Sequence, residues 1–126
     1  MSTYFVHSFL INFPNRVDYL KVVKEMRKEE FRMWLEDRGT MGKRPIADAL
    51  SRCKRLESSL DVDLDVEYSS DYGKSLISLL EYSTEDEKYE KQPPEGVYFV
   101  PGSNIKNGMA SLRNAVKKYF EFCRTN

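Results

Sequence analysis

The chain has 126 residues, which fits one domain with enough buried surface to fold without disulfide or metal staples. Hydrophobic residues form 40% of it and aromatic residues 13%, a composition that excludes a globally disordered protein. The 20 basic and 20 acidic residues cancel, so any attraction to a charged partner must come from local patches.

The charges are segregated along the chain. Residues 1–58 hold 12 basic and 8 acidic residues, residues 59–100 hold 3 and 11, and residues 101–126 hold 5 and 1. This distribution predicts separate basic and acidic surfaces, unless folding mixes the segments.

Residues 1–13 (MSTYFVHSFLINF) are apolar without a clear period. We expect an ordered arm that packs on the domain, on a protein partner or on a second copy of the chain. The segment is too short to cross a bilayer, and it has neither a basic region nor a cleavage site, so we expect a cytoplasmic protein. Its histidine, His7, is expected to be structural.

A long amphipathic pattern over residues 14–38 predicts a helix that starts at Pro14 and ends at a left-handed Gly39. Arg27 interrupts the apolar stripe, so an alternative is two shorter helices that meet near residues 25–28. Trp34 is expected to anchor the core.

A second helix is predicted over residues 45–58, beginning at a proline. Its apolar face contains Ile46, Ala49, Leu50, Cys53 and Leu56. The opposite face is basic, with Arg52, Lys54 and Arg55, and a short basic turn with Lys43 and Arg44 precedes the helix.

Residues 61–67 (DVDLDVE) alternate acidic and aliphatic side chains. Because Asp is a poor strand former, we expect an extended acidic linker. The spacing is similar to that of a calcium loop, but Val66 and Tyr72 stand where such a loop needs Gly and Glu, so no metal site is predicted.

A helix capped by Ser70 or Asp71 is expected to run to about residue 82. Thr84 and Glu87 match a capping box for one further turn. Residues 90–96 have the composition of a loop, and residues 97–100 are expected to be extended and able to pair with residues 4–6.

Residues 103–124 have the cleanest helical pattern of the chain. Its apolar face contains Ile105, Met109, Leu112, Val116, Tyr119 or Phe120, and Cys123. Lys106, Arg113, Lys117 and Arg124 line up as a basic stripe beside that face. Together the patterns predict a mainly all-α fold, a compact bundle of four to five helices over residues 14–126, with residues 1–13 as an arm or as part of a small two-strand pairing.

No catalytic motif stands out. The sequence has no nucleophile elbow, phosphate loop, dinucleotide-binding glycine pattern or HExxH motif. Two cysteines and one histidine do not supply the usual tetrahedral zinc site, and we expect Cys53 and Cys123 to be buried free thiols. The sequence therefore predicts a protein that is not an enzyme and that has no catalytic residue, no cofactor and no metal.

Three segments resemble a known family. The string FRMWLEDRG (residues 31–39) is similar to the F-x-x-W-L-x-x-x-G that opens the core-binding, SAM-like domain of tyrosine recombinases. Residues 45–57 stand where that domain has its second helix, and SLRNAVKKYFEF (residues 111–122) resembles its last helix. The middle of the chain resembles N-terminal domains that precede HNH-type restriction endonuclease domains.

The resemblance, over roughly residues 28–124, implies a non-catalytic helical module that holds duplex DNA in mobile-element, phage or defence systems. It implies DNA contacts by Arg52, Lys54, Arg55, Arg113 and Lys117, and the neighbouring Lys43, Arg44, Lys106 and Arg124 extend the predicted set. The chain departs from this family in two ways. It lacks the catalytic residues of recombinases, and its net charge is zero, which weakens binding to phosphates. The alternative is a small interaction or inhibitor protein that acts through its acidic middle and its apolar arm.

Overall fold

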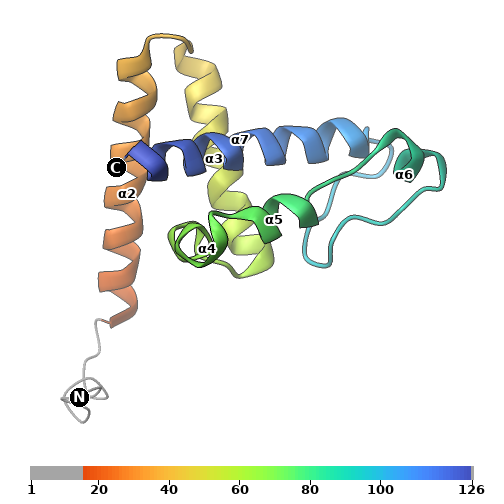
Figure 1. The fold of residues 1–126 in the computed structure, drawn as a ribbon, viewed down its shortest axis with the longest axis horizontal. Helices are drawn as coiled ribbons and strands as arrows, with labels where there is room; N and C mark the ends of the chain where they lie inside the picture. The colour runs from red at the N-terminus through yellow and green to blue at the C-terminus, as the bar shows by residue number, and fades with distance from the viewer. Residues whose placement is uncertain (1–15, 126) are drawn as a thin grey trace.

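A computed structural model describes residues 16–125 of the chain, with side chains from Arg27 onward. The predicted arm over residues 1–13 lies outside this range. The described part is mainly helical and contains no strand, which confirms the predicted all-α class (Figure 1). Its helices are α2 (Arg16–Arg38), α3 (Lys43–Leu60), α4 (Leu64–Asp71), α5 (Lys74–Leu79), α6 (Thr84–Lys88) and α7 (Ile105–Thr125).

Helices α2 and α3 form a hairpin at one end of the molecule (Figure 1). Helix α2 runs through Arg27 without a break, so the two-helix alternative is wrong. Gly39 ends it with φ of 68°, the left-handed conformation that glycine adopts without steric cost, as predicted. Helix α3 begins at Lys43, two residues earlier than predicted, because Gly42 already accepts the first helical hydrogen bond from the Ile46 amide at 3.2 Å.

Helix α7 crosses the hairpin and organises the core (Figure 1). It contacts α2, α3, α4, α5 and α6. Met109, Leu112 and Val116 of the apolar face that the sequence predicts are buried. Leu112 is only 2% exposed. Trp34 packs at the edge of the core, half-buried, with its ring centroid 5.9 Å from that of Phe122. Cys53 is buried and Cys123 half-buried, both as free thiols.

The acidic segment is not an extended linker, and that prediction is wrong. Helix α4 begins at Leu64 because Asp63 is its N-cap: the Asp63 carboxylate accepts from the amides of Asp65 at 2.9 Å and Val66 at 3.2 Å. The residue type that disfavours a strand is among the best at starting a helix. The alternation of acids and aliphatic residues is therefore no strand signal here.

The helix predicted up to residue 82 is shorter, since α5 begins at Lys74 and ends at Leu79. The capping box of α6 lies one residue earlier than predicted. Ser83 accepts from the Asp86 amide at 3.0 Å, and Asp86 accepts from the Ser83 amide at 2.8 Å. Residues 97–100 form no strand within the described part of the chain, and their predicted partner lies outside it.

Candidate functional site

The outer face of α3 is strongly basic. The helix has five basic residues, Lys43, Arg44, Arg52, Lys54 and Arg55, all outside its buried face. It has two acidic residues, and Glu57 turns toward α4, where its carboxylate accepts from the Leu64 amide at 2.9 Å. Asp48 is the acid left on the outer side, 3.7 Å from Arg44. The exposed part of α3 therefore has a net positive charge.

In each of two pairs of these residues, the two side chains leave the helix in nearly the same direction. Lys43 and Lys54 are eleven residues apart, as are Arg44 and Arg55. Eleven residues advance an α-helix by about 16 Å and bring a side chain back to within about 20° of the same direction. The pairs therefore form two parallel basic rows on α3.

Arg55 is held by the segment that precedes α7. Its guanidinium donates to the Tyr98 carbonyl and lies 5.2 Å from the centroid of the Phe99 ring. A Cβ atom added at Gly96 would overlap the Ser59 carbonyl, so this segment runs directly along the C-terminal half of α3. Arg55 is thus a fixed cation at the end of its row.

The predicted basic stripe on α7 divides into two halves. In the N-terminal half, Lys106 donates to Thr84 Oγ1 at 2.9 Å and Arg113 donates to the Leu80 carbonyl at 3.0 Å. Both side chains thus tie α7 to the α5–α6 region. In the C-terminal half, Lys117 and Arg124 are exposed, and no described side chain forms an ion pair with either of them.

The basic residues of α3 and α7 do not point the same way. The side of α7 that faces the Arg55 segment is marked by Gly108, whose missing Cβ leaves room for the Phe99 ring. Arg113 is five residues farther along, which turns it by about 140° around α7. The predicted DNA contacts therefore belong to two separate surfaces of the described structure.

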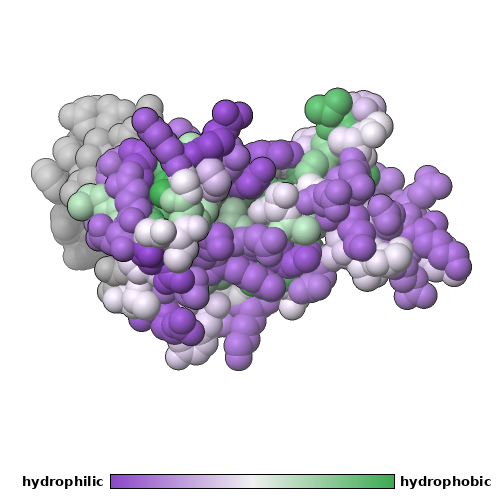
Figure 2. Space-filling model, turned by 90° about the horizontal axis from the view of Figure 1, so that it is seen from above, coloured by the Kyte–Doolittle hydropathy of each residue, from purple (hydrophilic) through white to green (hydrophobic). Residues whose placement is uncertain are grey.

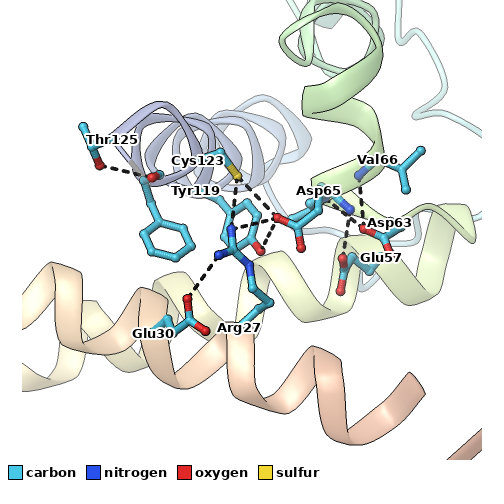
Figure 3. A network of polar contacts seen from close by, with 11 residues as sticks. Arg27, Glu30, Glu57, Asp63, Asp65, Val66, Tyr119, Cys123 and Thr125 are labelled. Atoms are coloured by element: carbon cyan, nitrogen blue, oxygen red, sulfur yellow. Dashed lines mark hydrogen bonds and ion pairs between the residues drawn. The ribbon is translucent and has the colours of Figure 1, made fainter. Parts of the chain in front are cut away.

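A polar network that the sequence patterns did not predict joins three helices (Figure 3). Arg27 of α2 donates to Asp65 of α4 at 3.0 Å and to Glu30 at 3.1 Å. The same Asp65 oxygen accepts from the Tyr119 hydroxyl of α7 at 2.9 Å, and the Cys123 thiol lies 3.5 Å from it. One carboxylate thus connects α4 to both long helices.

The electrostatics of this network favour structure over reactivity. Burial, and then the neighbouring Asp65 carboxylate, raise the pKa of the Cys123 thiol to about 12. Burial and Asp65 also raise the pKa of the Tyr119 hydroxyl. Burial opposes the charge of Arg27, but its hydrogen bonds to Asp65 and Tyr119 outweigh this and raise its pKa. At neutral pH the thiol and the phenol therefore stay protonated and Arg27 stays charged.

One sequence signal could have revealed the network. Arg27 interrupts the apolar stripe of α2, and a charged residue in such a stripe needs a partner once the helix packs. The sequence cannot identify that partner, because Asp65 is 38 residues away and resembles the other acids of its segment.

None of the described helices is long and apolar enough to cross a membrane. Comparison with models of protein families, with curated proteins and with solved structures finds no match to the chain.

Proposed function

We propose that the chain is a non-catalytic, cytoplasmic module that binds duplex DNA through the outer face of α3. The observation that carries this proposal is the pair of basic rows on α3, both outside its packed face, with Asp48 as the one acid on the outer side, beside Arg44. Lys and Arg side chains in rows can neutralise several phosphates at once, and this releases the counterions that drive DNA binding. The resemblance to recombinase core-binding domains supports the same proposal, and it depends in part on the same helix, residues 45–57.

A role without catalysis agrees with the state of the two thiols. The pKa of Cys53 is raised to about 12, mainly by burial, and that of Cys123 to the same value. A thiol must ionise to act as a nucleophile, and at neutral pH these do not. The described residues also include no group of three or more His, Cys, Asp or Glu placed to hold a metal ion.

The test is binding of a labelled duplex at several salt concentrations. Lys43→Ala with Lys54→Ala should weaken binding and flatten the plot of log K against log salt by up to about two units, because two phosphate contacts are lost. Since phosphate contacts carry no base information, the loss should be the same for unrelated DNA sequences.

Two double variants with the same change in net charge serve as controls. Lys117→Ala with Arg124→Ala tests the exposed half of the α7 stripe, and Lys74→Ala with Lys88→Ala tests exposed lysines on α5 and α6. Both should leave the slope near that of the wild type. If the wild type binds duplex no better than an unrelated neutral protein at low salt, the proposal is wrong.

A second candidate function has its own observation. Helix α6 exposes Glu85 and Glu87, and the neighbouring Tyr89 is 70% exposed. An acidic surface with an exposed aromatic ring suits a basic protein partner. This candidate predicts no affinity for duplex and an interaction that Glu85→Gln with Glu87→Gln abolishes.

A further inference from the structure

The segment before α7 alternates between the core and the solvent. Val97 is buried and Phe99 packs against the core, whereas Tyr98 is 77% and Val100 76% exposed. Two aromatic neighbours in sequence therefore have opposite roles. Phe99 anchors the segment to the core, whereas the side chain of Tyr98 is exposed to solvent.

Contacts on both sides of Tyr98 hold its backbone in place. Arg55 donates to the Tyr98 carbonyl, and the Val97 amide donates to the Pro94 carbonyl at 3.0 Å. On the other side, the Ser103 hydroxyl donates to the Val100 carbonyl at 2.6 Å. A ring carried on a fixed backbone loses little entropy when it binds a partner.

The surroundings of Tyr98 differ from those of the other two strongly exposed tyrosines. Tyr72 packs edge-to-face on Tyr68, and the ring of Tyr89 is already in contact with a cation, the Lys88 ammonium 5.6 Å from its centroid. Tyr98 has no ring partner among the described aromatic residues, and its carbonyl is bonded to the basic face of α3. Arg52 lies one helical turn before Arg55 on that face.

We propose that Tyr98 stacks on an unpaired base of the DNA that α3 holds. The chain would then favour a duplex with a single-stranded extension over a blunt one. An exposed ring on a backbone that is bonded to a basic helix face fits a nucleotide, because the ring can take the face of the base while the cations of the helix take its phosphates. On the face shown in Figure 2, hydrophilic residues separate the apolar areas of the described residues, which suits one base better than a broad protein interface. This inference rests on the proposed function.

The experiment compares the affinity of the full chain for a blunt duplex and for the same duplex with a 5′ or a 3′ single-stranded extension. The wild type should bind one of the extended forms about tenfold more tightly than the blunt form. Tyr98→Ala should remove this preference and leave blunt binding unchanged. Tyr98→Trp should keep it, and Tyr89→Ala, which removes a ring of similar exposure, should keep it too.

The outcomes separate the two proposals. If the wild type binds blunt and extended duplexes equally, or if Tyr98→Ala weakens both alike, the stacking inference is wrong while duplex binding stands. If neither DNA is bound, the proposed function fails and the inference fails with it. Tyr98→Leu keeps an apolar side chain without a ring, so a preference that survives in this variant also overturns stacking.

Discussion

Arg27 and Asp65 form an ion pair of 3.0 Å between helices α2 and α4. The pair is partly buried, and Tyr119 and Cys123 from α7 converge on the same carboxylate oxygen. The Arg27 guanidinium also lies 4.6 Å from the centroid of the Phe122 ring. Because one carboxylate bonds to side chains of both long helices, this network helps to fix how α2 and α4 sit against α7.

Replacing Asp65 should destabilise the fold more than removing any one of its donors. Asp65→Ala removes the acceptor that Arg27 and Tyr119 share, and only Arg27 keeps another acceptor, Glu30. We expect a loss of about 1–3 kcal/mol in the free energy of unfolding. Tyr119→Phe removes one hydrogen bond and should cost about 1 kcal/mol. Urea denaturation measures both. An Asp65→Ala variant as stable as the wild type would mean that the network is only a surface feature.

Gly73 joins α4 to α5 at a point where a side chain does not fit. Its φ is 78°, and an added Cβ would overlap the Phe120 ring. Gly73→Ala should therefore combine backbone strain with steric overlap and cost about 2–4 kcal/mol. Gly39→Ala is the matched control, since Gly39 has φ of 68° with no atom within 4 Å of the added Cβ. It should cost only about 1 kcal/mol, from strain alone. Equal losses in thermal denaturation would contradict this reading of the α4–α5 link.

Leu112 lies at the middle of the buried face of α7. Leu112→Ala should cost about 2–5 kcal/mol, because the core cannot close the cavity completely. Leu79→Ala deletes the same atoms from a side chain that is 51% exposed, and it should change stability by about 0.5 kcal/mol or less. Chemical denaturation measures both variants, and equal losses of stability would contradict the placement of Leu112 in the core.

Cys53 should make the fold sensitive to alkali. Burial raises its pKa from 9.0 to about 12, so between these values the unfolded state has lost a proton that the folded state keeps. Stability therefore falls as pH rises through this window, by up to about 1.4 kcal/mol per unit for this thiol. From about pH 8 to about pH 10.5, the wild type should lose about 2 kcal/mol more than Cys53→Ala. Parallel stability curves for the two proteins would exclude a buried, protonated thiol.

The sequence predicts the long elements well because their signals are local. The apolar spacing of α3 and α7 identifies the buried residues, and Gly39 marks the end of α2. The same logic fails at Asp63 and Ser83, where one polar residue serves equally well in a linker or as a cap. Whether such a residue caps a helix depends on one hydrogen bond, and a single bond leaves no repeating pattern in the sequence.

The sequence predicts which side of each helix is basic, but not where that side lies on the folded molecule. The pattern identifies Arg55 and Arg113 as basic residues outside the core, but it does not say which way each helix is turned in the bundle. That depends on packing, through contacts such as the one between Phe99 and Gly108. Tyr98 lay in an expected extended segment, and its exposure follows from Phe99 taking the inner position.

The central place of α7 has a consequence for how the protein is made. Residues 16–104 leave the ribosome before α7 does, so the apolar faces of α2, α3 and α4 are complete before their shared partner exists. At about 5–20 residues per second, the 21 residues of α7 take on the order of one to several seconds to synthesise. During that interval the nascent chain exposes its future core, and we expect it to be a chaperone substrate until α7 closes the fold.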